Sequence, residues 1–300
     1  MGVGLLLGRF APLLLWPAAL ALLAVWLGRW PKPGVWLLAA AFSVILVGAS
    51  VKTLEPKPSG SQLREVSSTA TDARTWEDVQ ALSIRNSTGN ISVTGGGSWR
   101  LRARYRWGAG ARARGIPGEL VTAQRGRTLD FTGLEPSWSQ GPLRGAEAQL
   151  RARVPRATTL SVEARSSDVT AQNLASAQIE INLGDVTLSN VAGAAVAATD
   201  IGNVFMTDIG GGIEAKTLMG DVWLEPRPSP APILARADVG DVALVLPFGT
   251  DARIVATSTS RELPENFKRL SPTQGERVLG NGSRLIVLTT RVGRISLVQR

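Results

Sequence analysis

One short phrase returns five times between residues 161 and 246: a small residue, then Asp or Asn, then Val, then an alternating run of apolar and polar residues. The spacing from each Asp or Asn to the next is 17, 18, 18 and 20 residues. A period of this size is typical of chains that stack one small unit, because each unit completes its core only against its neighbours. The phrase occurs at Ser167-Asp168-Val169, Gly184-Asp185-Val186, Gly202-Asn203-Val204, Gly220-Asp221-Val222 and Gly240-Asp241-Val242.

Apolar and polar residues alternate on both sides of each phrase, as in 179–183 and 186–188. Alternation with a period of two over four to six residues is typical of half-buried strands. We therefore predict an all-β repeat domain over residues 76–300, a β-solenoid-like stack with its clearest repeats over 160–246. An antiparallel β-sandwich is the second choice. A weaker copy of the unit spans Leu82–Val93, whereas the stretch 108–145 departs from the pattern and is predicted to be an insertion.

The Gly and Asp or Asn of each phrase are predicted to be structural corner residues. Glycine adopts backbone angles that other residues resist, and Asp or Asn hydrogen-bonds its own backbone in turns. A stack of carboxylates could also suggest calcium, but calcium takes six to eight oxygens and each corner supplies one carboxylate. We therefore expect no metal and no cofactor. The predicted corners are Gly89, Asn90, Asp168, Gly184, Asp185, Gly202, Asn203, Gly220, Asp221, Gly240 and Asp241.

The sequence contains no Cys and no His. This excludes disulfides, thiol nucleophiles, Cys/His metal sites and the Ser-His-Asp triad. Carboxylate pairs on β-solenoids can cleave sugars, and Asp200 and Asp208 both lie in Thr-Asp-Ile-Gly. A carbohydrate-active enzyme is therefore a distant alternative, while two ordinary turns are the simpler interpretation. We predict that the protein is not an enzyme.

The first 50 residues carry only three charged side chains, Arg9, Arg29 and Lys32, whereas all 24 acidic residues come later. Apolar stretches at about 10–28 and 35–51 approach the ~20 residues that a spanning helix needs. We predict a two-helix membrane anchor over 1–51, a flexible linker over 52–75, and a multi-pass protein of the cell membrane. A cleaved signal peptide that ends near Ala49 is the alternative for one of the two stretches. Lys and Arg counts of four against two favour a cytoplasmic β domain, a margin that leaves its side open.

The sharpest charged pattern is the alternation over residues 99–107. On a strand it places Arg100, Arg102, Arg104 and Arg106 on one face and apolar residues on the other. Like charges in a row repel, so the arrangement needs a reason. A solvated face that also protects a sheet edge is the simpler interpretation, and a face that binds anionic lipid or an anionic envelope polymer is the functional hypothesis. No nucleic-acid partner is expected, since no recognised module accompanies the pattern.

The Gly-Asp/Asn-Val corners flanked by alternating strands resemble the DUF4097 family, bacterial β-strand repeat proteins whose name implies adhesion. The resemblance covers about Leu160–Leu246 well and Leu82–Val93 weakly. It implies a membrane-anchored, non-catalytic, adhesin-like interaction or structural module of the bacterial cell envelope. Related envelope proteins imply an alternative, a regulatory envelope-stress protein that acts by binding a membrane protein partner.

Overall fold

The computed structural model describes residues 76, 78–106, 121–133, 147–260 and 263–300, all within the unit Gly60–Arg300. The predicted membrane helices and linker lie outside these residues. Within the described ranges no helix is long and apolar enough to cross a membrane.

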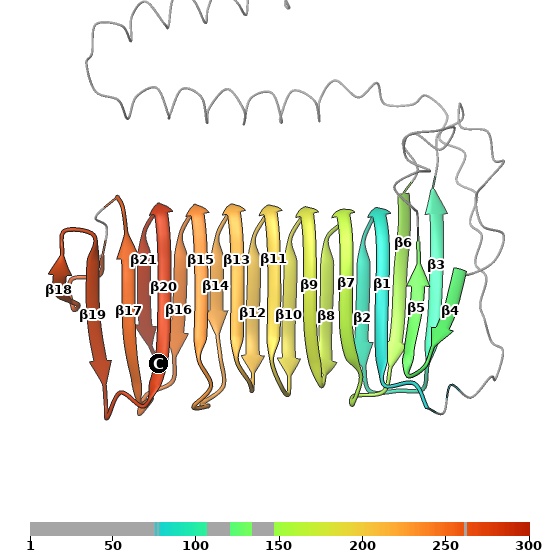
Figure 1. The fold of residues 1–300 in the computed structure, drawn as a ribbon, viewed down its shortest axis with the longest axis horizontal. Helices are drawn as coiled ribbons and strands as arrows, with labels where there is room; N and C mark the ends of the chain where they lie inside the picture. Colours follow the sequence, from blue (N-terminus) through green and yellow to red (C-terminus); the bar gives the residue numbers. More distant parts are fainter. Residues whose placement is uncertain (1–75, 77, 107–120, 134–146, 261–262) are drawn as a thin grey trace, which may run out of the picture. The chain divides into compact units, whose positions relative to one another are not determined.

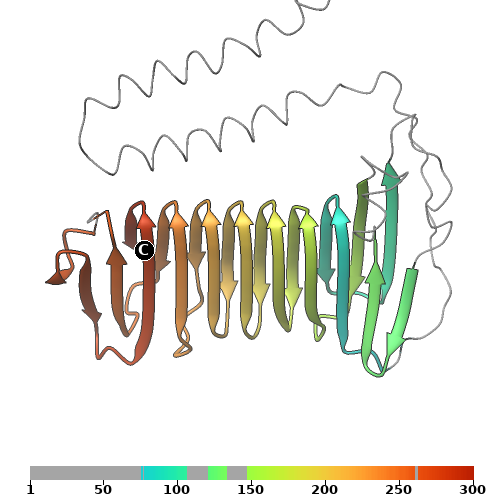
Figure 2. The ribbon, with the colours of Figure 1, turned by 45° about the horizontal axis from the view of Figure 1, so that its top comes forward.

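The described strands form two sheets that face each other as two layers (Figures 1 and 2). Sheet A contains, in spatial order, β4 (Val121–Arg125), β5 (Thr128–Thr132), β1 (Ala81–Thr88), β7 (Thr159–Ser166), β9 (Ser176–Leu183), β11 (Ala195–Ile201), β13 (Ile213–Met219), β15 (Ile233–Val239), β20 (Arg284–Val292), β17 (Ala252–Ser258), β19 (Gln274–Leu279) and β18 (Lys268–Ser271). Sheet B contains β3 (Arg100–Arg106), β6 (Glu147–Val154), β2 (Ile91–Gly95), β8 (Val169–Leu174), β10 (Val186–Val191), β12 (Val204–Ile209), β14 (Val222–Glu225), β16 (Val242–Leu246) and β21 (Ile295–Gln299).

Each repeat unit is a rung of two strands, one in each sheet, joined at a predicted corner. The chain runs along sheet A, turns, and returns along sheet B in the opposite direction (Figure 1). Within each sheet the central strands pair in parallel with their counterparts in the next rung, for example β9 with β11 and β10 with β12. The all-β repeat prediction is therefore confirmed as a β-solenoid-like stack. The antiparallel sandwich is wrong for the centre of the stack, where every described pairing from β7 to β16 is parallel.

The core lies between the two sheets, where the inward residues of every strand meet. In β7 the inward Leu160, Val162 and Ala164 are buried, while the outward Ser161 and Glu163 are exposed. The same alternation in each rung joins the inward residues into one continuous apolar cluster from Val79 to Ile295. Because successive strand residues point to opposite faces, the outward residues remain available for other roles.

Both ends of the stack are built out of sequence order. The rung β1–β2 lies between β5–β6 and β7–β8, so the described strands begin inside the stack, form its end, and then pass back. At the other end β20–β21 lies between β15–β16 and β17. The stretch 108–145 is thus not wholly an insertion, because β5 pairs in parallel with β1. Antiparallel pairing occurs in the described residues only at these ends, in β3–β6, β4–β5, β17–β19 and β18–β19.

Candidate functional site

The corner glycines form a column along which successive rungs are in close contact. Gly220 has a φ of +142°, and a Cβ there would lie 2.1 Å from the carbonyl oxygen of Gly202. Any side chain would therefore meet both backbone strain and a backbone clash. The predicted corners Gly89, Gly184, Gly202, Gly220 and Gly240 all have positive φ, and Gly293 is a further member that the sequence analysis missed.

The Asp and Asn side chains link each corner to the next rung. The backbone N–H of Asp185 donates to Asp168 Oδ1 at 3.0 Å, and the N–H of Asn203 donates to Asp185 Oδ1 at 2.7 Å. Asp221 N–H in turn donates to Asn203 Oδ1 at 2.8 Å, so an amide oxygen serves as well as a carboxylate. The same bond continues through Asp241 to the N–H of Arg294. Asn90 joins its neighbour through its backbone carbonyl, which accepts from Leu150 N–H at 2.8 Å.

The described residues contain no cluster of three or more carboxylates or other ligands that could hold a metal ion. Each corner carboxylate instead accepts one backbone hydrogen bond from the next rung. This geometry gives each backbone N–H at a corner an acceptor within the protein, although most of these corner residues are exposed.

The two Thr-Asp-Ile-Gly carboxylates are not brought together. Asp200 lies on β11 in sheet A and accepts from Asn182 Nδ2 at 2.8 Å. Asp208 lies near the end of β12 in sheet B, at the end of that strand away from the Gly202-Asn203 corner. Hydrogen bonding and the charge of Arg227 lower the pKa of Asp208 below its usual range. A lowered pKa keeps this carboxylate ionised, which is the opposite of what a general acid at neutral pH needs.

The predicted arginine face lies on β3, an edge strand of sheet B. Arg100 and Arg102 are exposed and Arg104 is half-buried. Arg106 pairs through its backbone with Glu147, and its side chain lies outside the described residues. The apolar side of the strand faces the core, where Leu101, Ala103 and Tyr105 are buried.

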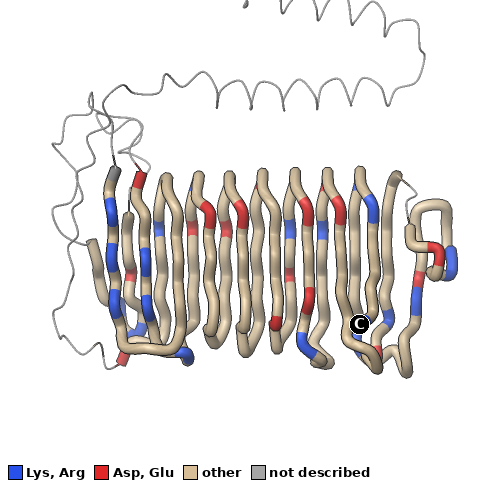
Figure 3. Tube along the Cα trace, turned by 180° about the vertical axis from the view of Figure 1, so that it is seen from behind, with Lys and Arg blue, Asp and Glu red and all other residues tan. Residues whose placement is uncertain are grey.

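The structure adds two arginines that the sequence analysis missed. In the antiparallel register of β3 and β6, Arg102 is directly opposite Arg151 and Arg100 is directly opposite Arg153. All four side chains are exposed on the outer face of sheet B, and we call Arg100, Arg102, Arg151 and Arg153 the arginine patch. The described residues give none of the four an ion pair. Figure 3 shows the basic residues of these two strands gathered at one end of the stack.

Cross-strand neighbours of like charge destabilise a sheet. Two such pairs, side by side, are therefore not explained by the stability of the fold. A multivalent anionic partner would remove the repulsion and gain the charge-assisted hydrogen bonds that guanidinium groups form with phosphate or carboxylate.

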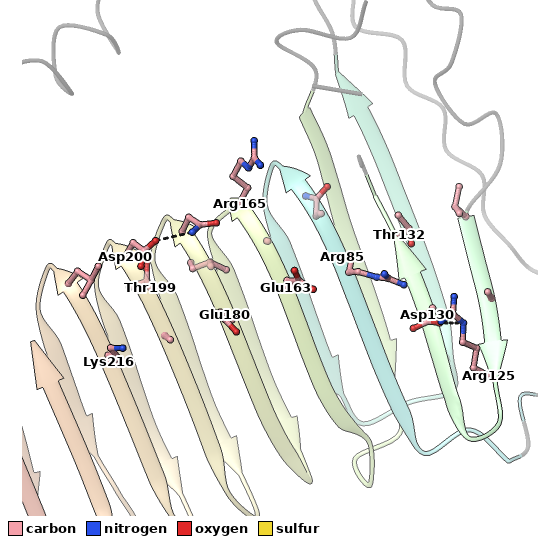
Figure 4. A pocket seen from close by; sticks show the side chains of 18 residues that line it. Arg85, Arg125, Asp130, Thr132, Glu163, Arg165, Glu180, Thr199, Asp200 and Lys216 are labelled. Carbon is pink, nitrogen blue, oxygen red and sulfur yellow. Dashed lines mark hydrogen bonds and ion pairs between the residues drawn. The ribbon is translucent and has the colours of Figure 1, made fainter. Parts of the chain in front are cut away.

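A second candidate site lies on the outer face of sheet A, at the same end of the stack. There the sheet A strands from β4 across to β13 line an open hollow of about 900 Å³ (Figure 4). Its lining includes the cations Arg85, Arg125, Arg165 and Lys216. It also includes an equal number of carboxylates, those of Asp130, Glu163, Glu180 and Asp200. Sequence analysis could not find this hollow, because its walls come from strands that are distant in the chain.

The model of the Toastrack DUF4097 family matches residues 63–297. The chain belongs to this family. The Toastrack match extends across both out-of-order ends of the stack as well as its regular centre.

Two solved structures match this Toastrack chain with low sequence identity and low TM-scores. A candidate cell adhesion protein from Clostridium sporogenes has a TM-score of 0.30 and 8% identity, over 80% of this chain and 98% of that one. A candidate adhesin from Bacteroides fragilis has a TM-score of 0.29 and 13% identity, over 74% of this chain and 94% of that one. No curated protein matches the sequence.

Proposed function

We propose that this protein is a membrane-anchored, non-catalytic interaction module of the bacterial cell envelope whose arginine patch holds the β stack against anionic lipid headgroups. The observation that carries the proposal is the pair of like-charged contacts, Arg100 with Arg153 and Arg102 with Arg151, on one exposed face. The non-catalytic part is supported by the separation of Asp200 and Asp208 on different sheets.

The position of the patch suits a contact with the membrane that carries the predicted anchor. The predicted linker leads into the rung β1–β2, and β2 pairs directly with β6 of the patch. A flexible linker of 24 residues, 52–75, spans about 25–30 Å on average. The patch is therefore within reach of the bilayer, and each Arg near a negatively charged leaflet contributes about 1 kcal/mol.

A regulatory role through a membrane protein partner is the second candidate. It is favoured by an exposed aliphatic row at the corner edge of sheet A, in which each residue directly precedes a corner glycine. The exposed fractions are 43% for Leu183, 46% for Ile201, 41% for Val239 and 51% for Val292. Binding of such a partner would depend on this apolar row and would change little with the charge of the lipids.

The lipid contact can be measured in the full chain, inserted in nanodiscs of neutral lipid or of neutral lipid mixed with phosphatidylglycerol. Because the sequence has no Cys, a spin label on Ser92→Cys is the only labelled site. Ser92 is exposed on β2 beside Arg151, so the label reports how close the patch comes to the bilayer. Relaxation by nickel-chelating headgroups should be stronger in anionic discs at low salt and should decline as salt is added.

The variant R100Q/R102Q/R151Q/R153Q should lose the enhancement in anionic discs while its thermal unfolding stays unchanged. Equal relaxation in neutral and anionic discs for the unmodified protein would contradict the lipid contact. An enhancement that depends on Ile201 and Val239 but not on the arginines would mean that the apolar row, and not the arginine patch, contacts the bilayer.

The anchor has its own test. A chain that begins at Arg74 lacks both apolar stretches and should dissolve without detergent, while the full chain partitions with membranes. If the shortened chain still sediments with membranes from neutral lipid, the anchor lies elsewhere or is incomplete.

A further inference from the structure

We propose that the hollow on sheet A binds a short peptide segment carrying both charges, with its basic group held by Glu163 and Glu180 and an adjacent acidic group held by Arg85. This site lies on the sheet opposite the arginine patch and does not depend on the lipid contact.

The hollow has the size of a ligand site, and paired strands form its walls. Small-molecule and peptide pockets commonly measure about 300–1,000 Å³, and the hollow of about 900 Å³ falls in this range. Its floor is formed by paired strands, while the hairpin β4–β5 forms one wall (Figure 4). Every residue of β4 is exposed, as expected of a strand that borders an open hollow rather than the core.

The charges on the floor follow one row across neighbouring strands. Arg85 on β1 is in register with Glu163 on β7, and Glu163 is in register with Glu180 on β9. Adjacent strands are about 4.8 Å apart, so the two glutamates are close neighbours on one face. Two carboxylates in this position repel each other, and a bound ammonium or guanidinium would turn the repulsion into attraction.

Partners within the protein do not neutralise this row. The described ion pairs include neither Glu163 nor Glu180, and Arg85 extends toward β5 in Figure 4. Asp130, the carboxylate nearest that side, is already paired with Arg125 at 3.1 Å. Arg85 is therefore placed to hold an anionic group of a ligand, one strand away from the two glutamates.

The spacing of these groups selects the ligand. The glutamates and Arg85 lie one strand apart, so a ligand that binds both needs a positive and a negative group about 5–7 Å apart. Alternate residues of an extended peptide provide this separation, at ~3.3 Å per residue. Beyond Glu180 the row continues with Ala198 and then Lys216. The single methyl group of Ala198 leaves room for the segment to continue, and Lys216 can hold a second acidic group.

The test uses the full chain in nanodiscs of neutral lipid, with an environment-sensitive dye on Val121→Cys at the rim of the hollow. The probes are three capped tripeptides: Asp-Gly-Lys with both charges, Asn-Gly-Lys with the cation alone, and Asp-Gly-Gln with the anion alone. Each exposed charge contact is worth up to ~1 kcal/mol, so the doubly charged peptide should bind about fivefold more tightly than either other peptide.

Variants should remove the two preferences separately. E163Q/E180Q should bind Asp-Gly-Lys no better than Asp-Gly-Gln, and R85Q should bind it no better than Asn-Gly-Lys. Glu214→Gln, an exposed glutamate of β13 outside the hollow lining, is the control for charge removal and should retain both preferences. Equal affinity for the three peptides, no detectable binding, or an equal loss in the control would overturn the proposal.

Discussion

The centre and the ends of the stack differ in the order and direction in which their strands pair. From β7 to β16 the rungs follow one another in sequence order, and the same corner bonds recur from Asp168 to Asp241. At both ends the chain doubles back and strands pair in antiparallel fashion, and at the first end arginines face each other across β3 and β6. Both candidate sites include strands of the first end, β3 and β6 on one sheet and β4, β5 and β1 on the other.

This difference distinguishes the residues that stabilise the fold from those that are available to bind a partner. In the centre a residue recurs because the next rung needs its contact, so the repeat itself explains it. At the first end the four residues of the arginine patch have no ion pair among the described residues, and the next rung places the uncharged Ser92 and Thr94 beside Arg151 and Arg153. The corner residues of the centre therefore belong to the scaffold and the charged residues of the first end belong to the surface. Variants at the two regions should behave differently.

The largest effect is expected at a central corner glycine. Gly220→Val would combine a β-branched residue at φ +142° with a Cβ placed 2.1 Å from the Gly202 carbonyl oxygen. Backbone strain alone costs ~1–3 kcal/mol, so the total should exceed ~3 kcal/mol or prevent folding. The same change at Gly249, which has a φ of +78° and no neighbour within 4 Å, should cost only the strain. Urea unfolding measures both, and equal losses would mean that rung contact does not constrain the corner.

The next largest effect concerns the corner side chains. Asp185→Ala leaves the N–H of Asn203 without its acceptor and should cost ~1–2 kcal/mol. Asp185→Asn keeps an oxygen at the same position and should be nearly neutral, as Asn203 itself illustrates. The melting temperatures of both variants, measured in the presence and absence of calcium, test this expectation. A large loss for Asp185→Asn, or melting that depends on calcium, would indicate a metal site instead.

A smaller effect of opposite sign is expected at the end. Arg151→Glu places an opposite charge across from Arg102 and should stabilise the domain by ~0.2–1 kcal/mol. The gain should disappear in R102Q/R151E, because the cross-strand pair is then absent. The stabilised variant should also lose proximity to anionic lipid. Destabilisation by Arg151→Glu would mean that the arginines already contribute to the fold.

The smallest effect depends on pH. The hydrogen bond from Arg227 lowers the pKa of Asp208 in the folded state below the ordinary value of 3.8. A lowered folded-state pKa means that the stabilisation is fully present above the unfolded pKa and is lost as the pH falls through the folded one. The difference in unfolding free energy between the unmodified protein and Asp208→Asn should therefore shrink below about pH 3.8. A difference that stays constant on acidification would mean that this pair contributes no charge-dependent stability.

The centre of the fold could be predicted because its signal is local and repeated. Alternation and corner residues occur within each unit of about 18 residues, and backbone pairing between units follows from the repeat. The rung β20–β21 escaped detection because Arg294 replaces Asp or Asn at its corner and because it inserts beside β15–β16 out of order.

The candidate sites were predictable only in part. The arginines of β3 were evident from one strand's alternation, but Arg151 and Arg153 join them through a pairing with β6 that nothing in the sequence specifies. The row of Arg85, Glu163 and Glu180 likewise spans strands that are separated by up to 95 residues in the chain. Outward residues carry no repeat signal, so their assembly depends on register and can only be seen in three dimensions.

The most direct test of the account compares charge removal at the two ends of the stack. In anionic nanodiscs, the label on Ser92→Cys should report membrane proximity that falls with salt in the unmodified protein. The same dependence should persist when Arg253, Lys268, Arg269 and Arg291, at the far end, are changed to Gln. It should vanish when the four residues of the arginine patch are changed instead. An equal loss in both variants would show that net charge alone attracts the domain, and no loss in either would contradict a role for the patch.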